Sequence, residues 1–448
     1  MPYRKSTLAI VSLILLLIIS GLLSVIAAQG GTSPVVITRG LNSPRHLSFD
    51  AEGNLYVAES GTGGDFDIQG PFGPAKAGGS SSIHRSGTDG TETEFLIGLP
   101  STDNLNGEVL GAAKVMVQDE SIWLLLAQGS LDNPFTYSLL ELSSDNKRVL
   151  TQVDLYSFEV ENNPDGGVID SNPVDFVVSP EGVFYIADAG ANAVYTWSEA
   201  EGLAVFAAWE DNPVPTSVEL GSDGSVYIGF LTGFPFPTGG ARVEHFDVEG
   251  QLTETYEGFT AVVDLLFAND TLYAVQIGEF GDQGWAPNSG RVVDVFSGST
   301  YFDGLSFPYG LAINQNGNLF LSTGSSYTGP GGGQVLSLDG VDLNGAVVTP
   351  PPPTQVPPTS TPEVTEEPGE TAEPTGEVES TSEVTPEPTE EPTEEPTEEP
   401  TEEPTDEVEP TEEPTDEVPP TDEVEPTVEV TITEPPVETV EPTEEPGT

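Results

Sequence analysis

A short hairpin unit that recurs along the chain is the feature that most constrains its fold. In the first copy, two apolar runs, Arg45–Phe49 and Asn54–Ala58, flank the acidic turn Asp50-Ala51-Glu52-Gly53. The glycine of this turn accepts the positive φ that a tight hairpin turn requires. Four copies keep a proline nine residues before the turn glycine, at Pro44/Gly53, Pro173/Gly182, Pro215/Gly224 and Pro308/Gly317. Two degenerate copies lack both anchors, at Gly111–Leu125 and Ala261–Val275.

Three positions of the six aligned copies each keep one class of side chain. The first strand carries an apolar residue: Phe49, Met116, Val178, Leu220, Leu266 and Ile313. The second strand carries another apolar residue (Leu55, Ile122, Phe184, Val226, Leu272, Leu319) and then an aromatic one: Tyr56, Trp123, Tyr185, Tyr227, Tyr273 and Phe320. Successive aromatic residues lie 42 to 67 residues apart, and strand repeats of that length are typical of a β-propeller, in which each repeat forms one blade. The sequence therefore predicts an all-β, six-bladed β-propeller over residues 33–345.

The second strand of the unit also indicates how the sheets are stacked. Leu55-Tyr56-Val57-Ala58 is apolar at consecutive positions, as expected of a strand buried on both faces between neighbouring blades. No segment after the N-terminal leader keeps a 3.6-residue period, so no helix is expected in the propeller. The last blade, Leu311–Leu338, supplies three strands of its own. We expect the short strand Val35–Thr38 to complete it and to close the ring without a free edge.

The N-terminal residues predict export. Residues 1–28 combine the basic pair Arg4-Lys5, the apolar run Leu8–Val25 and the segment Ile26-Ala27-Ala28, which match the three parts of a signal peptide. Cleavage near Ala28 would release a secreted, extracellular protein. The apolar run approaches the ~20 residues that span a bilayer, so the alternative is an uncleaved leader that anchors the protein at the cell surface. A membrane is expected as a partner only in that case.

The C-terminal residues 350–448 predict a disordered tail. Repeats of TEEP and TDEVEP carry 33 of the chain's 75 acidic residues and no lysine or arginine, and they offer almost no large apolar side chain to bury. Proline and charge repulsion favour an extended spacer, and the threonine and proline content also fits O-glycosylation. The whole chain has 11 basic residues, too few for the clusters that nucleic-acid binding requires. It has no cysteine, which excludes disulfides and thiolate metal sites, and we expect a monomer.

Three long connections have unusual compositions. The glycine-rich residues 61–82 are expected to form a loop, and they match no phosphate-binding motif. Residues Glu159–Asn172 crowd asparagine, aspartate and glycine together, which would suit calcium, although Asx-turns explain the same residues. Residues Gly229–Gly240 place Phe234 and Phe236 between prolines, either as a contact surface or as a cover for a blade edge.

Several long, irregular stretches carry a family resemblance. They include GLNSPRHLSFDAEGNLYVAESG at 40–61, GPFGPAKAGGSSSIHR at 70–85, NNPDGGVIDSNPVDFVV at 162–178 and GFTAVVDLLFANDTLYAV at 258–275. In this order, over about residues 35–340, the chain resembles the ScyD/ScyE family, exported propellers named for their association with scytonemin biosynthesis clusters. The resemblance implies a propeller of the NHL or TolB type. The chain departs from the family at His46, where glycine is usual, and near Ala75-Lys76-Ala77, where the family carries a Cys-Tyr pair.

Candidate site residues are sought at the mouth of the central channel, because strand ends from different blades converge there. The chain contains no GxSxG, HExxH or CxxC motif, and it has only three histidines. Positions after the proline anchor and after the aromatic column give six predicted ligand-binding residues: Arg45, His46, Glu59, Asp175, Asp188 and Gln276. Three of the acids, Glu59, Asp175 and Asp188, are candidate ligands for one calcium or magnesium ion. The alternative is that Glu59 and Asp188 end their strands by bonding the next turn.

Two functional hypotheses follow from these residues. The favoured one is an exported propeller that binds or scaffolds an unidentified small molecule or protein, without catalysis and without a cofactor. The resemblance implies that such a protein assists extracellular metabolite biosynthesis. The alternative is a metal-dependent hydrolase or lyase of lactonase-like type that acts at the channel mouth, by analogy with other six-bladed propellers.

Overall fold

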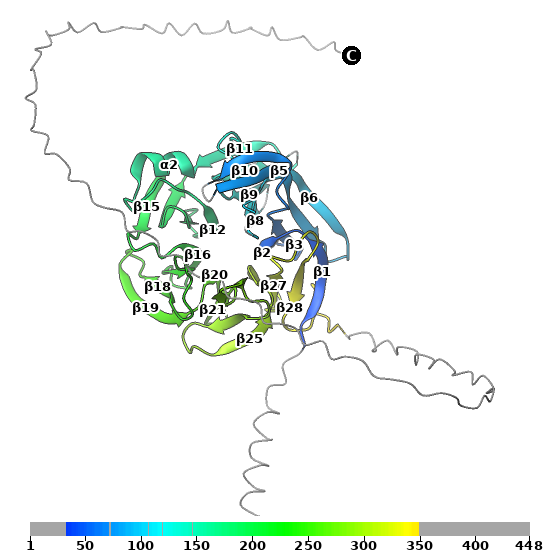
Figure 1. The fold of residues 1–448 in the computed structure, drawn as a ribbon. Coiled ribbons are helices and arrows are strands. Elements are labelled where there is room, and N and C mark those ends of the chain that lie inside the picture. The colour runs from blue at the N-terminus through cyan, green and yellow to red at the C-terminus, as the bar shows by residue number, and fades with distance from the viewer. Residues whose placement is uncertain (1–32, 71–72, 106, 119, 146, 349–448) are drawn as a thin grey trace, which may run out of the picture. The chain divides into compact units, whose positions relative to one another are not determined.

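A computed structural model describes residues 33–348, except 71–72, 106, 119 and 146. Six antiparallel sheets, each of four strands or more, follow one another in chain order around a single axis (Figure 1). This arrangement confirms the predicted six-bladed β-propeller. The predicted leader, residues 1–28, and the predicted tail, residues 350–448, lie outside the described residues. Within the described part of the chain, no helix is both long and apolar enough to cross a bilayer.

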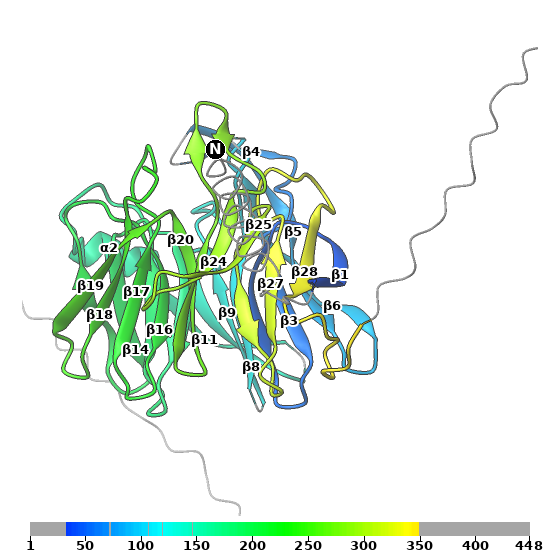
Figure 2. The same cartoon turned by 90° about the horizontal axis from the view of Figure 1, so that it is seen from below.

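In each blade the strands are placed one after another from the axis to the rim (Figure 1), and each strand runs roughly along the axis (Figure 2). The innermost strands are β2 (Pro44–Phe49), β8 (Ala112–Gln118), β12 (Pro173–Val178), β16 (Pro215–Leu220), β20 (Val262–Ala268) and β26 (Leu311–Ile313). The second strands are β3 (Leu55–Glu59), β9 (Ser121–Leu126), β13 (Phe184–Asp188), β17 (Val226–Phe230), β21 (Thr271–Gln276) and β27 (Leu319–Thr323). The third strands are β5 (Gly73–Ser86), β10 (Ser138–Ser143), β14 (Ala193–Ser198), β18 (Ala241–Phe246), β24 (Gly290–Asp294) and β28 (Gly333–Ser337). The outermost strands are β6 (Glu92–Asp103), β11 (Val149–Asp154), β15 (Gly202–Ala208), β19 (Leu252–Phe259), β25 (Thr300–Leu305) and β1 (Val35–Leu41).

The last blade is built from both ends of the propeller. Its sheet has the order β1-β28-β27-β26, so the N-terminal strand forms its outer edge. β1 runs antiparallel to β28, with Val36 opposite Leu336 and Arg39 opposite Gln334. The predicted closure by an N-terminal strand is confirmed. Without β1, the outer edge of β28 would present an open row of main-chain N–H and C=O groups. The pairing with β1 satisfies these groups.

The two degenerate copies depart from the predicted alignment by one residue. In the regular copies, the apolar residue of the first strand faces that of the second strand. Val117 and Phe267 hold this place in the degenerate copies. The predicted residues, Met116 and Leu266, face the aromatic position instead. The turn between the two strands is one residue shorter in these copies, and a count along the sequence misses that difference.

The prediction that residues 61–82 form a loop is wrong for most of this segment, which forms strands. Residues Phe66–Gly70 form strand β4, which pairs with the first part of β5 as a hairpin. The glycines here let two backbones approach closely, because a Cβ on Gly78 would lie 2.6 Å from the Cα of Gly64. Glycines that suggested a loop therefore permit the segment before β4 to lie closely against β5. Two shorter pieces complete the strands: β7 (Val109–Leu110) and the hairpin β22–β23 (Phe280–Gly281, Gly284–Trp285).

One helix lies between the second and third blades, contrary to the prediction that the propeller contains none. Helix α2 spans Leu155–Asn162. Asp154 caps its start by accepting the Ser157 N–H at 3.0 Å, and Asn163 ends it in the left-handed conformation at φ 37°. A helix of about two turns is too short for the 3.6-residue period to stand out in the sequence.

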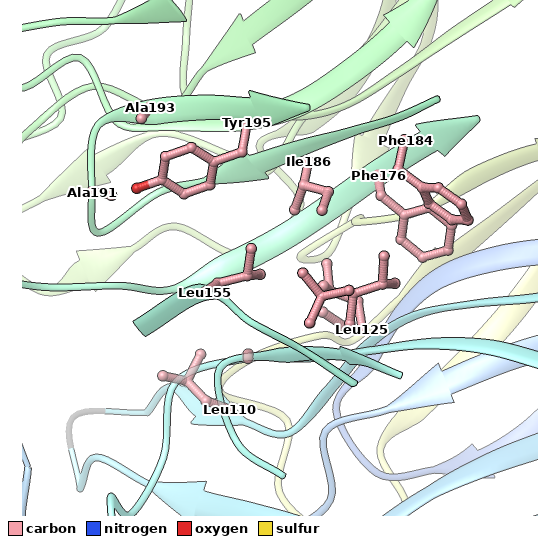
Figure 3. Close-up of a cluster of buried hydrophobic side chains, with 13 residues drawn as sticks. Leu110, Leu125, Leu155, Phe176, Phe184, Ile186, Ala191, Ala193 and Tyr195 are labelled. Carbon is pink, nitrogen blue, oxygen red and sulfur yellow. The ribbon is translucent and has the colours of Figure 1, made fainter. Parts of the chain in front are cut away.

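Apolar side chains packed between neighbouring blades form the core. Figure 3 shows the cluster between the second and third blades, where Leu125 lies near Phe176, Phe184 and Ile186 of the next blade. Leu155, the first residue of α2, belongs to the same cluster and is fully buried. Each such side chain contributes roughly 1.5–3 kcal/mol on burial, so facing apolar sheets hold the ring together.

Candidate functional site

A β-bulge near the start of the innermost strand brings side chains from different blades together. In five blades, the register of the first hairpin shifts directly after the anchor residue. Two residues after the anchor, these blades carry His46, Lys114, Asp175, Ser217 and Asp264. We call these five residues the axial cluster, because they contact one another across the ring. The sixth blade has Gly310 at this place, and a Cβ there would lie 2.5 Å from the Cα of His46.

Hydrogen bonds link the axial cluster from each blade to the next. Three of its side chains accept an N–H of the following innermost strand: Asp175 that of Val218 at 2.9 Å, Ser217 that of Leu265 at 2.8 Å and Asp264 that of Leu311 at 2.6 Å. Innermost strands pair with only one neighbour in their sheet, so their inner edges carry unpaired N–H groups. The axial cluster therefore accepts hydrogen bonds from main-chain N–H groups of the innermost strands that have no partner within their own sheet.

Opposite charges face each other within the axial cluster. Lys114 Nζ lies 2.7 Å from Asp175 Oδ1. Burial alone would raise the pKa of Asp175, but the Lys114 ammonium holds this pKa below its usual range. Burial would lower the pKa of Lys114, and the carboxylate of Asp175 raises it instead. Burial raises the pKa of nearby Glu219 to about 8, with Asp175 and Asp264 adding to the effect and Lys114 opposing it.

His46 has a ring nitrogen without a partner. Its Nδ1 lies 3.1 Å from the carbonyl oxygen of Ala113, which can only accept, so Nδ1 carries a proton. Its Nε2 faces Asp264 Oδ1 at 3.4 Å and Asp175 Oδ1 at 3.7 Å, and it forms no hydrogen bond. The imidazole is buried and packs edge-on against the ring of Tyr309.

The six predicted site residues fall into two groups, of which the first lies near the axis. Arg45, His46 and Asp175 belong to it: Arg45 lies 4.5 Å above the Tyr309 ring that His46 also contacts. The Arg45 side chain is buried, and one of its Nη groups donates to the carbonyl of Val109 at 2.6 Å. Arg45 therefore joins the start of the first blade to β7, which precedes the second blade, and its buried position leaves it little freedom to meet a ligand.

The second group consists of Glu59, Asp188 and Gln276, each at the end of a second strand. Each side chain accepts an N–H from the connection that enters its own blade: that of Asn42 at 2.5 Å, Asn172 at 2.6 Å and Thr260 at 2.8 Å, respectively. Burial raises the pKa of Glu59, and it raises that of Asp188 to about 6. These residues tie strand ends to turns. The predicted metal trio of Glu59, Asp175 and Asp188 is not assembled.

Among the described residues, two groups of three potential metal ligands come close together. One group is buried: His46, Asp175 and Asp264. The other is partly exposed: Glu59, His84 and Glu94. The predicted alternative calcium loop, Glu159–Asn172, contributes to neither group. Asp165 of that loop accepts the Gly167 N–H at 2.7 Å, which is the Asx-turn alternative.

A pocket of about 440 Å³ lies between the first three blades. Three connections line it: the β4–β5 hairpin, the segment from β9 to β10, and the segment from β11 to β12. Each of these connections follows the second or the fourth strand of a blade. Because the strands of a blade are antiparallel, all three connections lie on the same face of the ring. We call this cavity the face pocket. Its apolar and aromatic wall includes Leu131, Ile169, Tyr137 and Tyr156. Its carboxylates are Asp132, Asp170 and Asp67, of which Asp67 forms an ion pair with Lys76 Nζ at 2.6 Å. None of the lining residues is lysine, arginine or histidine.

Hydrogen bonds fix several groups of the face pocket. Gln128 Nε2 donates to Asp170 Oδ1 at 2.5 Å, and burial raises the pKa of Asp170. Tyr137 Oη donates to the carbonyl of Gly129 at 2.6 Å, and burial raises the pKa of Tyr137 to about 12. The rings of Tyr137 and Tyr156 lie 5.2 Å apart between centroids. The pocket therefore presents oriented aromatic rings beside acceptor groups.

The sequence prediction missed Lys114, Ser217 and Asp264, although a signal for them existed. Each stands two residues after the anchor position, as His46 and Asp175 do in copies that keep the proline. Lys114 and Asp264 lie in the degenerate copies, where no proline marks the anchor. The face pocket had no such signal, because it joins three connections that are distant in sequence.

No family model and no curated protein matches the chain. Similar solved structures include a streptogramin B lyase, with a TM-score of 0.41 and 10% identity, covering 68% of this chain and 96% of that chain. A virginiamycin B lyase from Staphylococcus aureus with quinupristin has a TM-score of 0.40 and 11% identity, covering 68% and 98%. Regucalcin, a calcium-binding protein from Agrobacterium tumefaciens, has a TM-score of 0.43 and 11% identity, covering 68% and 93%.

Proposed function

We propose that the chain is an exported β-propeller that binds a small organic cation in the face pocket. The observation that carries this proposal is a cavity of about 440 Å³ lined by two tyrosines and three carboxylates. Cavities of roughly 300–1,000 Å³ with aromatic walls and a few polar groups are the usual form of small-molecule sites. Carboxylates attract positive charge directly, and tyrosine faces attract it through the ring quadrupole. A ligand with both a cationic group and an apolar body fits this lining.

Binding is favoured over the alternative of a metal-dependent hydrolase or lyase at the axis. Such an enzyme needs acidic or imidazole groups that a substrate can reach. The side chains of His46, Asp175 and Asp264 are at most 3% exposed. Their carboxylates also serve as acceptors for main-chain groups of the next blade. Accessible recognition groups lie in the face pocket instead.

The proposed setting of this binding is outside the cell. It rests on the leader at residues 1–28, whose basic start and apolar run match a signal peptide. The resemblance to the ScyD/ScyE family adds a role in the assembly of an extracellular metabolite. A propeller that holds a small cation outside the cell would retain or present such a molecule without converting it.

Calorimetry with three related probes tests the proposal on the full-length protein. We expect benzyltrimethylammonium to bind, benzyl alcohol to bind more weakly and benzoate not to bind, because the lining carries negative charge. The titrations belong at about 0.15 M salt, which screens the acidic residues outside the pocket. Tyr156→Ala and Asp170→Asn should each weaken binding of the cation by about tenfold.

The matched control is Asp282→Asn, which removes an exposed carboxylate of the β22–β23 turn outside the pocket. It should leave the affinity unchanged. Equal affinity for benzoate and for the cation would contradict the proposal. So would a cation affinity that neither pocket variant alters.

A further inference from the structure

We propose that the propeller axis holds one divalent transition-metal ion, bound by His46 Nε2, Asp175 Oδ1 and Asp264 Oδ1. One ligand atom from each of these residues lies within 4.8 Å of the other two. The three residues come from β2, β12 and β20, which are the innermost strands of the first, third and fifth blades. The ion would join alternate blades at the centre of the ring. This site is separate from the face pocket and does not depend on the ligand proposed there.

The unpartnered nitrogen of His46 is the observation that points to an ion. Nδ1 donates its proton to the Ala113 carbonyl, so Nε2 is the ring atom that faces the two carboxylates, and it forms no hydrogen bond with either of them. A buried polar atom without a hydrogen bond is unfavourable, and a cation between this nitrogen and the two carboxylates would satisfy all three groups. Histidines that bind metals commonly donate their other ring N–H to a main-chain carbonyl, as His46 does.

The spacing of the three atoms suits a small ion. A tetrahedral ion with bonds of about 2.1 Å separates its ligand atoms by about 3.4 Å. His46 Nε2 lies 3.4 Å from Asp264 Oδ1 and 3.7 Å from Asp175 Oδ1. A protonated imidazole would instead be expected to draw one carboxylate to about 2.7–2.9 Å. Two longer, similar distances favour an ion shared by all three residues.

Main-chain groups hold both carboxylates in place. Asp264 accepts the Leu311 N–H at 2.6 Å and the Leu265 N–H at 2.9 Å. Asp175 accepts the Val218 N–H at 2.9 Å. Such bonds orient ligands before the ion arrives and reduce the entropy lost on binding. The site is therefore organised by the same contacts that join the blades.

The donor set indicates the class of metal. One imidazole nitrogen with two carboxylate oxygens suits zinc or manganese, whereas calcium and magnesium prefer sets made only of oxygen. Lys114 already offsets one carboxylate charge through its 2.7 Å contact with Asp175. Asp264 forms no ion pair with a lysine or arginine among the described residues. Asp175 is common to this site and to the calcium or magnesium site expected from the sequence, but the other two ligands and the class of metal differ.

Metal analysis of the full-length protein tests the proposal. After purification without chelator and gel filtration, we expect about one zinc or manganese ion per chain by mass spectrometry of the elements. After removal of the metal, zinc or manganese should raise the melting temperature and calcium should not. Asp264→Asn keeps the shape of the ligand and should lower the metal affinity by at least about tenfold. Glu94→Gln is the matched control, because it removes a ligand of the partly exposed group, and it should leave the metal content unchanged.

Two results would overturn the proposal. One is a metal-free protein whose melting temperature responds to none of these ions. The other is metal that persists in Asp264→Asn but is lost in Glu94→Gln. If Asp264→Asn does not fold, cobalt(II) loaded into the unmodified protein should give the strong visible absorption of a four-coordinate site. A nitrogen NMR spectrum in which both ring nitrogens of His46 carry protons would contradict metal binding directly.

Discussion

The carboxylate of Glu159 is buried on α2 with one of its oxygens unpaired. Tyr195 Oη donates to Oε2 at 3.0 Å, and Oε1 has no hydrogen-bond partner. Burial raises the pKa of Glu159 from its usual 4.5 to about 7, and the bond from Tyr195 opposes this shift. The folded state therefore keeps a proton that the unfolded chain releases. Stability from this group is complete below about pH 4.5 and is lost as the pH rises to about 7.

Glu159→Gln should remove this dependence, because glutamine fills the same space without a charge. We expect the variant to be more stable than the unmodified protein at pH 8, by up to about 3 kcal/mol, and no more stable at pH 4. Urea unfolding at pH 4, 6 and 8 measures the difference. Glu161→Gln, at an exposed position of the same helix, is the control and should show no such trend. A stability difference that does not vary with pH would contradict the prediction.

At the scale of the element, β1 is the fourth and outermost strand of the last blade, which would otherwise end at β28 with three strands. Removal of the residues up to Leu41 should lower the melting temperature and expose the edge of β28 to other chains. We expect dimers or larger species by light scattering coupled to gel filtration. A synthetic peptide with the sequence of Val35–Leu41 should restore the monomer and part of the lost stability. A shortened protein that stays monomeric and melts at the same temperature would show that β1 is dispensable.

The elements that the sequence predicts well are those whose structure depends on residues close together along the chain. Each first hairpin needs only a turn and two apolar runs, which lie within a short window, and all six exist. The sequence does not reveal the hairpin β4–β5, because the glycines around it serve close approach of the backbone, a purpose that composition alone cannot separate from a loop. Helix α2 was missed because its cap residues Asp154 and Asn163 equally suit turns. Elements whose identity depends on tertiary contact are the ones that the sequence leaves open.

The candidate site shows the same division between local and distant causes. His46 and Asp175 were predicted because they follow a proline that marks the start of a blade. Asp264 occupies the equivalent place, but its copy lacks that proline, so the repeat pattern does not mark this residue. The repeat pattern also places Glu59 and Asp188 at equivalent strand ends, but their side chains bond the connections at Asn42 and Asn172. A sequence pattern gives the position of a residue along a strand and not the atoms that its side chain contacts.

At the scale of the whole molecule, the axial cluster joins blades through bonds between side chains and the main chain. Ser217 Oγ accepts the Leu265 N–H at 2.8 Å and lies 3.0 Å from Asp175 Oδ2, so it connects the third, fourth and fifth blades. Ser217→Ala removes one of the two acceptors of the Leu265 N–H, which Asp264 Oδ1 also accepts at 2.9 Å, and it removes the hydroxyl that donates to Asp175 Oδ2. We expect a loss of about 0.5–1.5 kcal/mol and faster hydrogen exchange at the Leu265 amide.

The control for this variant is Ser297→Ala, at an exposed serine whose hydroxyl bonds Asp294 within one turn. Its expected cost is below about 0.5 kcal/mol, because water replaces the lost bond. Exchange and unfolding measured on both variants separate a contact between blades from a local one. Unchanged exchange at Leu265 in Ser217→Ala would show that the Ser217 hydroxyl does not help to hold the fourth and fifth blades together.

The seam between β1 and β28 also has a consequence for the order of events during synthesis. A ribosome makes β1 first, yet its partner strand appears only after five further blades have been made. Contacts so distant along the chain are slow to form, because much of the chain must be ordered before they bring any gain. The nascent protein therefore carries an unpaired strand at one end until the other end emerges. Sequence changes in β1 should affect whether the ring is completed far more than how each blade folds.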